Sequence, residues 1–293
     1  MTRIAFFGTD SFSIGVLNAM EAAGVEVELI VAPADRPAGR KLAMTAPPIA
    51  EWARERDIDL FQPEKLDAEA IEALRDCGEF DAFVVASYGK IIPQAVLDLP
   101  KAGCLNVHPS PLPKHRGASP LEFTILADER TTGVTIIEMD AKMDHGPIAA
   151  FREVVMPEWP ARPVFEAQCA QIGGELIAEV LPAYGAGTLE MREQNHDDAT
   201  FTKKVSKADA QITLEQIQSG DRAAFLKIQA YASWPNAWFT IPSPSAQEIT
   251  MRVVVKAAHF EGSPENGKLV VDRVVPEGSR EMDWDAFVLG YLK

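Results

Sequence analysis

Short apolar runs and stretches with helical spacing alternate along the first two thirds of the chain. The runs typical of strands are Arg3–Gly8, Val25–Ala32, Asp59–Gln62, Asp81–Ser87, Gly103–His108 and Gly133–Asp140. The stretches with helical spacing are Ser11–Ala23, Ile49–Arg56, Ala68–Cys77 and Val164–Leu181. Strands that alternate with helices predict an α/β fold with a doubly wound, mostly parallel, Rossmann-like sheet. Such sheets bind their ligands at the carboxyl ends of the strands.

The pattern changes near residue 200. Beyond it, one short helix is predicted at Asp221–Tyr231, and strand-like runs follow at Ala237–Ile241, Ile249–Ala257 and Lys268–Val275. This succession of one short helix and several strands predicts a second domain built as a small β-barrel of the OB type. We therefore expect an α/β domain over residues 1–185, an exposed linker over 186–202 and the β-barrel over 203–293.

Composition narrows the class of protein. Of the 293 residues, 47% are hydrophobic and 24% are charged, as in globular domains. The beginning of the sequence lacks the pattern of a signal peptide, and no apolar run approaches the roughly 18 residues that span a bilayer. The three cysteines form no CxxC pair. These features predict a cytoplasmic protein without disulfides and without a metal site.

The distribution of charge bears on possible partners. A net charge of −15 argues against a nucleic-acid partner. Residues 203–293, however, carry 11 basic and 11 acidic side chains, so the whole excess of acid lies within residues 1–202, where solvated helix faces account for it. Arg36, Arg40 and Lys41 lie close together in a polar loop, Pro33–Pro48. Three such cations suit phosphate contact, and an exposed loop without function explains them about as well.

The strongest candidate chemistry lies at the end of the run Gly103–His108. Asn106 and His108 are two residues apart, so a strand places both side chains on one face. Polar side chains there are costly to bury unless they are used. An amide that holds an oxyanion and an imidazole that moves a proton are what a tetrahedral intermediate needs. Asp140 or Asp144 offers a carboxylate partner, and spacing alone does not choose between them.

A stiff turn, Ser110-Pro111-Leu112-Pro113, follows this strand. Because proline fixes φ and removes a backbone donor, the turn either forms a rigid wall for a flat ligand or simply ends the strand. The basic trio Lys114-His115-Arg116 beside it is typical of solvated surface, and next to a pocket it would suit an anion. The earlier turn Gly8-Thr9-Asp10-Ser11 has a single glycine, which favours a helix N-cap over a dinucleotide site.

These motifs together resemble the 10-formyltetrahydrofolate-dependent formyltransferases, and among them the methionyl-tRNA formyltransferases. The resemblance runs almost from end to end of the chain. Its strongest part is Asn106-Val107-His108-x-Ser110-x-Leu112-Pro113-x-x-Arg116-Gly117-x-x-Pro120, completed by Asp144-x-Gly146. Further matches are Asp35-Arg36-Pro37-Ala38-Gly39-Arg40, Ser87-Tyr88-Gly89-Lys90-Ile91-Ile92-Pro93 and Trp234-Pro235-x-Ala237-Trp238-Phe239. Asp10, His115 and His145 depart from the family's usual residues.

The resemblance implies a catalytic triad of Asn106, His108 and Asp144, and it thereby selects Asp144 over Asp140. It also implies a folate site lined by the turn residues Ser110, Pro111, Leu112 and Pro113. The activation of the formyl carbonyl by hydrogen bonds makes a metal unnecessary. Basic side chains predict a track for the tRNA backbone, formed by Arg36, Arg40, Lys41, Lys203, Lys204 and Lys207.

The expected reaction moves the formyl group of 10-formyltetrahydrofolate onto the α-amino group of methionyl-initiator tRNA, for translation initiation. The enzyme is expected to be a monomer whose C-terminal domain binds the tRNA. One alternative is a formyltransferase for another amine, such as an amino sugar nucleotide. The basic loop and the segment Trp234–Phe239 favour tRNA over that alternative. A non-catalytic folate- or tRNA-binding protein is the other alternative, and the intact triad argues against it because a binder needs no group to move a proton.

Overall fold

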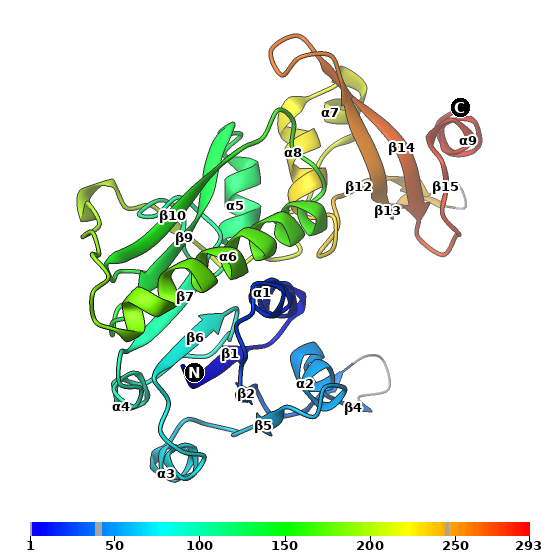
Figure 1. Ribbon diagram of the computed structural model, residues 1–293. Helices are drawn as coiled ribbons and strands as arrows, with labels where there is room; N and C mark the ends of the chain where they lie inside the picture. Colours follow the sequence, from blue (N-terminus) through cyan, green and yellow to red (C-terminus); the bar gives the residue numbers. More distant parts are fainter. Residues whose placement is uncertain (1, 39–42, 244–245) are drawn as a thin grey trace. The chain divides into compact units, whose positions relative to one another are not determined.

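The computed structural model of the chain, which describes residues 2–38, 43–243 and 246–293, divides into two compact units (Figure 1). Unit 1 comprises Met1–Gly117, Thr131–Val155 and Glu166–Phe201. Unit 2 comprises Ala118–Arg130, Met156–Phe165 and Thr202–Lys293. The boundaries predicted at residues 185 and 203 follow the chain in order, whereas the two units are built from interleaved segments.

A seven-stranded sheet forms the centre of unit 1. Its order is β10-β9-β7-β6-β1-β2-β5. The strands are β1 (Ile4–Gly8), β2 (Leu29–Val31), β5 (Asp59–Phe61), β6 (Ala82–Ala86), β7 (Cys104–His108), β9 (Thr131–Glu138) and β10 (Ile148–Val155). The five strands from β7 to β5 are parallel, whereas β9 is antiparallel to β7, and β10 is antiparallel to β9. The predicted doubly wound, mostly parallel sheet is therefore confirmed.

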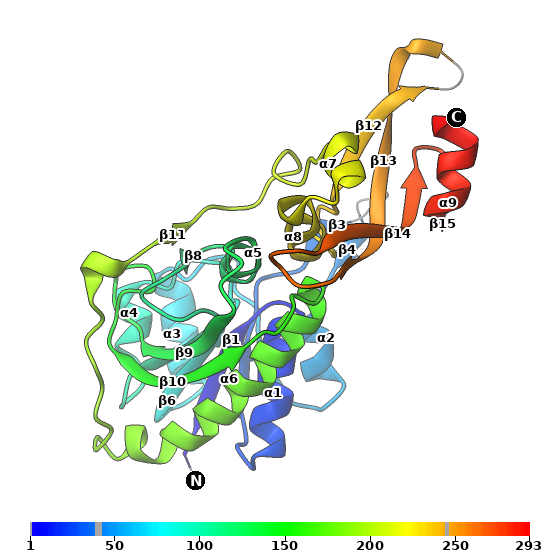
Figure 2. The same ribbon diagram turned by 90° about the horizontal axis from the view of Figure 1, so that it is seen from above.

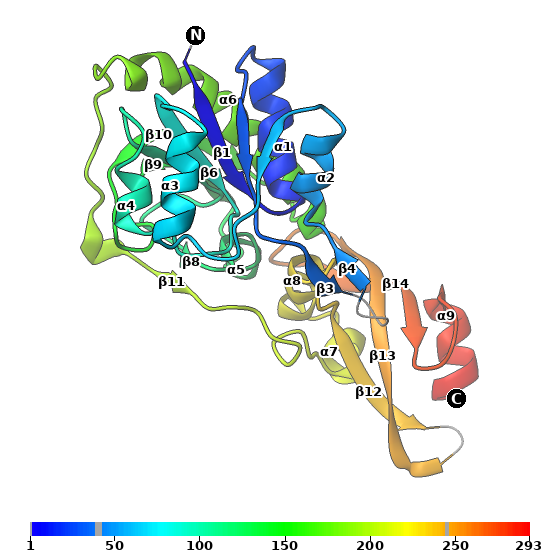
Figure 3. The same cartoon turned by 90° about the horizontal axis from the view of Figure 1, so that it is seen from below.

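Helices cover both faces of this sheet. Figure 1 shows α1 (Ser11–Ala22) and α6 (Arg162–Gly185) on one face and α3 (Ala68–Asp76) and α4 (Gln94–Leu97) on the other. The view from below, in Figure 3, shows α3 and α4 in front of the strands. Helix α2 (Pro48–Arg54) packs beside α1. With both faces covered, the inner strands read as continuous apolar runs rather than as alternating ones.

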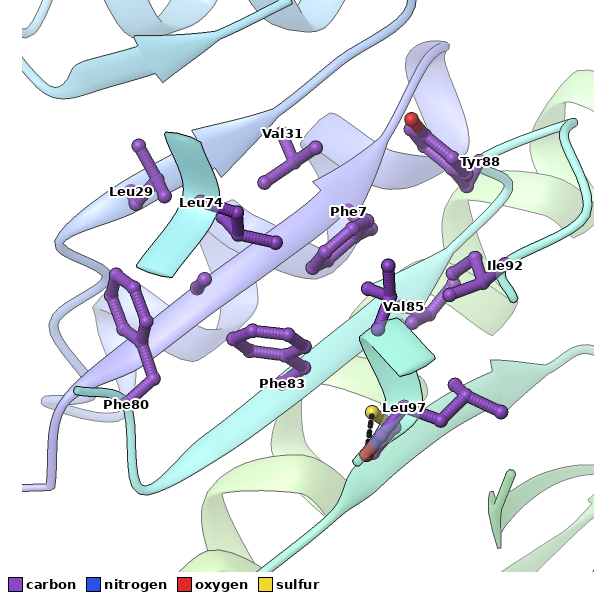
Figure 4. Close-up of a cluster of buried hydrophobic side chains, with 13 residues drawn as sticks. Phe7, Leu29, Val31, Leu74, Phe80, Phe83, Val85, Tyr88, Ile92 and Leu97 are labelled. Carbon is purple, nitrogen blue, oxygen red and sulfur yellow. Dashed lines mark hydrogen bonds between the residues drawn. The ribbon is translucent and has the colours of Figure 1, made fainter. Parts of the chain in front are cut away.

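Alternate residues of the inner strands build the core under α3 and α4. Phe7 of β1 and Phe83 of β6 lie 5.0 Å apart between ring centroids, and Leu74 of α3 and Leu97 of α4 cover them (Figure 4). The intervening residue Phe6 is fully buried on the opposite face. The strands are thus held in place by apolar packing on both sides, which fixes the positions of their carboxyl ends.

The turn after β1 is a helix cap, as its single glycine indicates. The Asp10 carboxylate accepts a hydrogen bond from the Ser13 backbone N–H at 3.3 Å, and the capping box is complete because the Ser13 side chain accepts from the Asp10 backbone. Asp10 also accepts a hydrogen bond from the Ser87 hydroxyl at 2.6 Å. Its side chain thus ties the turn after β1 to the turn after β6.

Unit 2 contains a four-stranded antiparallel sheet in the order β12-β13-β14-β15. Its strands are β12 (Trp238–Ser243), β13 (Ala246–Glu261), β14 (Lys268–Pro276) and β15 (Met282–Asp283), and its helices are α5 (Pro120–Leu126), α7 (Leu214–Ser219), α8 (Arg222–Ala230) and α9 (Trp284–Phe287). Helix α8 packs on β13 and β14, and the buried rings of Phe225, Phe239 and Phe287 form part of the core. The expectation of a small β-rich second domain is confirmed as this antiparallel sheet.

Several short elements differ from the sequence prediction. The polar loop Pro33–Pro48 contains an antiparallel pair, β3 (Arg36–Ala38) with β4 (Ala43–Thr45). Helices α4, α5 and α7 were not predicted because they have only four, seven and six residues, too few to give a clear period. Strand β10 was not predicted either. Two further short strands, β8 (Arg116–Gly117) and β11 (Phe201–Thr202), pair with each other. Among the helices that the structure describes, none has the length and apolar character to cross a membrane.

Candidate active site

Strand β7 carries the first two candidate residues. Asn106 is half-buried, and His108 is 4% exposed. Both lie on the same face because they are two residues apart on a strand whose register is fixed on both sides. Asn106 lies opposite Val85 of β6, and His108 lies opposite Thr135 of β9. The sheet therefore presents an amide and an imidazole side by side at the end of β7.

The two ring nitrogens of His108 have different partners. Nε2 lies 3.0 Å from the carbonyl oxygen of His115. Because a carbonyl oxygen only accepts, this contact assigns the proton of the neutral ring to Nε2. Nδ1 faces Oδ1 of Asp144 at 3.6 Å, which is within the range of an ion pair and beyond that of a hydrogen bond. The ring is thus held by one edge and faces a carboxylate with the other.

Asp144 is fixed by its backbone and by one of its oxygens. Its φ of 49° lies in the left-handed region, which costs a residue other than glycine on the order of 1–3 kcal/mol and persists only where the surroundings impose it. Oδ2 accepts a hydrogen bond from the backbone N–H of Gly117 at 2.7 Å. The other oxygen, Oδ1, is the one that faces His108. The carboxylate is therefore held with Oδ1 toward the imidazole.

Asp140, the other candidate carboxylate, is engaged elsewhere. Its Oδ2 lies 2.7 Å from Nδ1 of His145, and its Oδ1 accepts from the backbone N–H of Lys142 at 2.8 Å. Of the two carboxylates that sequence spacing left open, the structure brings Asp144 to His108.

The route by which Asp144 reaches the site differs from the prediction. In a parallel sheet the carboxyl end of β9 would lie beside that of β7, but β9 runs antiparallel, so its carboxyl end lies beside the beginning of β7, where Glu138 is opposite Leu105. The loop after β9 brings Asp144 to the imidazole instead. At Gly146 a side chain would overlap the carbonyl group of Glu138, so this tight loop requires glycine.

The turn Ser110–Pro113 is anchored on β9. The Ser110 hydroxyl donates to the carbonyl oxygen of Lys114 at 2.7 Å, and the Thr135 hydroxyl donates to that of Ser110 at 2.7 Å. Leu112 is buried against Ile137 and Ile148. Pro111 and Pro113 are half-buried, and the Leu112–Pro113 peptide is cis. Ser110 and Leu112 thus hold the turn, and the two proline rings are its partly exposed surface.

Arg116 is not the solvated surface cation that the basic trio suggested. The residue is 3% exposed, and its Nη2 lies 2.6 Å from Oε1 of Gln194 and 2.9 Å from Nδ1 of His196. Gln194 lies in the predicted exposed linker but is 5% exposed. Sequence reasoning missed it because an isolated glutamine among charged residues carries no periodic signal.

The basic side chains that were predicted to contact tRNA differ in their exposure and in their neighbours. Arg36 is exposed on β3, whereas Arg40 and Lys41 lie outside the residues that the structure describes. The pKa of Lys90 is lowered, first by burial and then by the positive charge of Arg36. The Lys90 ammonium donates to the carbonyl oxygens of Pro63 and Glu64. Two cations thus lie in one neighbourhood of unit 1.

In unit 2, Lys204 and Lys207 are exposed. Lys203 forms an ion pair with Asp209 at 2.5 Å, and hydrogen bonds from Lys203 and Ser206 lower the pKa of Asp209 to about 2. The charge of the Lys203 ammonium is thus already met by a carboxylate of the same unit.

No group of three or more histidine, cysteine or acidic side chains that could hold a metal ion occurs in the described part of the chain. The arrangement that does occur is a half-buried amide, a fixed imidazole and an aimed carboxylate. These groups can hold an oxyanion and move a proton, so they suit transfer of an acyl-type group.

Comparison with known proteins defines the class. Residues 2–180 match the family model described as formyl transferase. Because the match covers more than half of the chain, the chain belongs to this family, and it is an enzyme of formyl transfer.

Two curated relatives narrow the class. The chain is 41% identical over 239 residues to the methionyl-tRNA formyltransferase of Chloroflexus aggregans, covering 80% of this chain and 75% of the relative. It is 34% identical over 304 residues to that of Neisseria meningitidis serogroup C, covering 98% and 97%. The resemblance predicted from the motifs is thereby confirmed.

Solved structures show the same fold at lower identity. A likely sugar N-formyltransferase from Mycobacterium tuberculosis matches with a TM-score of 0.59 at 22% identity, covering 88% of this chain and 97% of that chain. HypX from Aquifex aeolicus, in complex with tetrahydrofolic acid, matches with a TM-score of 0.62 at 17% identity, covering 99% of this chain and 47% of that chain.

Proposed function

We propose that this protein transfers the formyl group of 10-formyltetrahydrofolate to the α-amino group of methionyl-initiator tRNA, and that it serves translation initiation as a cytoplasmic monomer. The observation that carries the proposal is the pairing of His108 with Asp144 at 3.6 Å, on the strand face of Asn106. It occurs in a chain that is 41% identical to a methionyl-tRNA formyltransferase.

The chemistry assigned to these residues follows from their positions. The neutral amine attacks the formyl carbon, a carbon–nitrogen bond forms, and the formyl oxygen takes on negative charge. Asn106 donates an amide N–H to this oxygen, and His108, as an imidazolium, donates from Nδ1, because Nε2 already donates to the His115 carbonyl. The bond to N10 of the folate then breaks.

Asp144 carries the proton from the amine to the leaving nitrogen in this scheme. Oδ1 accepts the proton from the attacking amine, directly or through a water molecule, and the proton passes on to N10 as that nitrogen leaves. Oδ2 stays bound to the Gly117 backbone, so the carboxylate does not rotate between steps. The carboxylate also lies 3.6 Å from Nδ1 of His108, where its charge attracts the positive charge of the imidazolium.

The turn Ser110–Pro113 is proposed as the wall of the folate site. Pro111 and Pro113 provide the rigid apolar surface, because their rings remain partly exposed. Ser110 and Leu112 hold that surface in place through the Lys114 carbonyl and the β9 side chains rather than by contact with the folate.

Binding of tRNA is proposed to depend on basic side chains that meet phosphates. Arg36, Arg40 and Lys41 form one group, and Lys203, Lys204 and Lys207 form the other. Replacing both Lys204 and Lys207 with glutamine is expected to raise KM for the tRNA and to lower its dependence on salt. Lys203→Gln is expected to have a smaller effect, because Lys203 is paired with Asp209. A salt dependence unchanged by the double replacement would contradict this assignment.

The test of the reaction follows transfer of labelled formyl from 10-formyltetrahydrofolate to methionyl-initiator tRNA. Asn106→Ala removes one oxyanion donor and is expected to lower kcat about 100- to 1,000-fold. Asp144→Asn should also lower kcat strongly, whereas the matched replacement Asp140→Asn should leave most activity, since Asp140 is bound to His145. Near-normal turnover by Asp144→Asn, or the reverse order of the two aspartates, would refute the assignment.

A second candidate function is formyl transfer to the amine of a sugar nucleotide. It is favoured by the fold shared with the likely sugar N-formyltransferase. The same triad serves both reactions, so the acceptor decides between them. Parallel assays with methionyl-initiator tRNA and with amino sugar nucleotides at equal enzyme concentration separate the two by their kcat/KM values.

A further inference from the structure

The segment between α6 and unit 2 runs beside the active site rather than away from it. Figure 2 shows it passing along unit 1 to β11, which lies next to β8. Within it, the Gln194 side chain is buried, and every polar position of its amide has a partner. A glutamine whose donors and acceptor are all satisfied inside a protein holds its partners in a fixed geometry.

Two of these partners belong to the loop of Asp144. Nε2 of Gln194 donates to the carbonyl oxygen of Asp144 at 3.0 Å and to that of Gly146 at 2.8 Å. The two bonds hold the backbone that follows the side chain of Asp144, a residue in the left-handed conformation. They therefore fix the conformation from which the Asp144 carboxylate is aimed at His108.

The orientation of the Gln194 amide is itself fixed. Its Oε1 accepts from Nη2 of Arg116 at 2.6 Å and from Nε at 3.3 Å. Because a guanidinium only donates, it binds the oxygen of the amide and leaves the nitrogen toward the Asp144 loop. His196 reinforces Arg116 from the side through Nδ1, and its ring stacks on His145 with 4.0 Å between centroids.

The same segment also supports the other edge of the imidazole. The Thr200 hydroxyl accepts from the backbone N–H of His115 at 2.8 Å, and the Thr200 carbonyl accepts from that of Arg116 at 2.9 Å. His115 in turn presents its carbonyl oxygen to Nε2 of His108. Residues 194–200 thus contact the backbone on both sides of the His108–Asp144 pair.

We infer that Gln194 is a positioning residue for formyl transfer, which acts through the Asp144 backbone to hold the carboxylate where it accepts the proton of the attacking amine. The inference rests on the proposed role of Asp144. Gln194 touches neither substrate in this assignment, so its loss should lower kcat without weakening substrate binding. Misplacement of a catalytic group by about 1 Å costs on the order of 100-fold in rate.

Gln194→Glu is the sharpest test. The carboxylate keeps the size of the side chain and still accepts from Arg116, but it has no N–H to donate to the carbonyl oxygens of Asp144 and Gly146. We expect kcat for formyl transfer to fall about 100-fold, with KM for 10-formyltetrahydrofolate and for the tRNA within about threefold of the parent. Gln194→Ala should give a similar kcat. If it fails to fold, Gln194→Glu decides alone, because its pairing with Arg116 is retained.

A control and a double variant separate this inference from its foundation. The neighbouring Glu193→Gln, at an exposed position, should leave kcat unchanged. In an Asp144→Asn background, Gln194→Glu should cause no further loss, since the group that it positions is already gone. The positioning role would be overturned if Gln194→Glu lowered kcat equally in both backgrounds. It would also be overturned if Gln194→Glu kept a kcat within threefold of the parent while Asp144→Asn was inactive. Full activity of Asp144→Asn would instead overturn the proposed function.

Discussion

The stability of unit 2 should depend on one half-buried arginine. Arg222, at the beginning of α8, is 17% exposed and forms four hydrogen bonds to two carboxylates. It donates to both oxygens of Asp128, at 3.0 and 2.8 Å, and to both oxygens of Glu158, at 2.8 Å each. The guanidinium also lies over the rings of Phe225 and Phe260, 5.1 and 4.6 Å from their centroids. Three separate segments of the chain meet at this side chain.

Replacing Arg222 with methionine keeps an unbranched apolar stem and removes the charge. Breaking a fully buried ion pair costs about 3–5 kcal/mol, and breaking an exposed one costs about 0–1 kcal/mol. Asp128 and Glu158 are 28% and 36% exposed, so water partly compensates the two carboxylates that are left. We expect Arg222→Met to lower the free energy of unfolding by about 2 kcal/mol, between these limits.

A matched control exists in the same unit. Arg273 also pairs with two carboxylates, Glu281 at 2.5 Å and Asp283 at 2.8 Å, but it is 43% exposed. Arg273→Met should therefore cost no more than about 0.5 kcal/mol.

Urea unfolding followed by tryptophan fluorescence measures the difference. Trp159, Trp234, Trp238 and Trp284 lie in unit 2, and Trp52 alone lies in unit 1, so the signal reports mainly on unit 2. The two units need not unfold together, which makes a probe weighted toward one of them necessary. An equal shift of the midpoint by Arg222→Met and Arg273→Met would refute the argument from burial.

The dependence on pH gives a second measurement of the same cluster. Burial alone raises the pKa of Asp128 and of Glu158, but hydrogen bonds from Arg222 outweigh it, so both pKa values lie below their usual range. Carboxyls with lowered pKa values in the folded state stabilise it above the ordinary carboxyl pKa and lose that contribution as pH falls. The parent should lose stability from about pH 5 downward, and the fall should be shallower for Arg222→Met.

Two further predictions concern reactivity and packing. Cys104 and Cys169 are buried, whereas Cys77 is exposed, and the pKa of all three thiols is raised, first by burial. Accessibility should therefore decide reactivity, so iodoacetamide should modify the folded protein mainly at Cys77, as peptide mass spectrometry would detect. Rapid labelling of all three would contradict the buried positions. Gly174→Ala places a methyl group against the backbone of α1 and should destabilise unit 1 by roughly 1–3 kcal/mol in urea unfolding. Gly185→Ala, near the end of the same helix, should cause no such loss. Equal stability of the two variants would refute the close approach of α6 to α1 at Gly174.

The sequence predicted those elements whose burial in the fold is visible in the local order of apolar and polar residues. Strands β1, β6 and β7 are covered on both faces, and burial on both faces leaves a continuous apolar run that is visible without the structure. Asn106 and His108 share a face for an equally local reason, since the period of a strand is two. Strand β10 was missed because it lies at the edge of the sheet, where Phe151 and Val155 are exposed and Arg152 pairs with Glu175 and Glu179 of α6.

The geometry around Asp144 was not predictable in the same way. Its approach to His108 depends on the reversal of β9, which is a property of strand pairing and not of local sequence. Gln194 depends on still more distant partners, since it is satisfied by the Arg116 guanidinium and by two backbone carbonyls about 50 residues before it in the chain. Backbone acceptors are present at every residue, so no residue type in the sequence indicates which of them a glutamine will meet.

The two left-handed residues beside His108 connect these observations. His115 has a φ of 61° and Asp144 a φ of 49°, and they approach the imidazole from its two opposite nitrogens. Histidine and aspartate are among the residue types that adopt this conformation more readily than most, but each still carries a cost. Two hydrogen bonds offset that cost in the folded protein: the His115 N–H donates to the Thr200 hydroxyl, and the Gln194 amide donates to the Asp144 carbonyl. Because these bonds hold both backbones, the imidazole and the carboxylate stay fixed when charge develops on the formyl oxygen in the proposed reaction. That is the condition under which fixed groups lower a reaction barrier most.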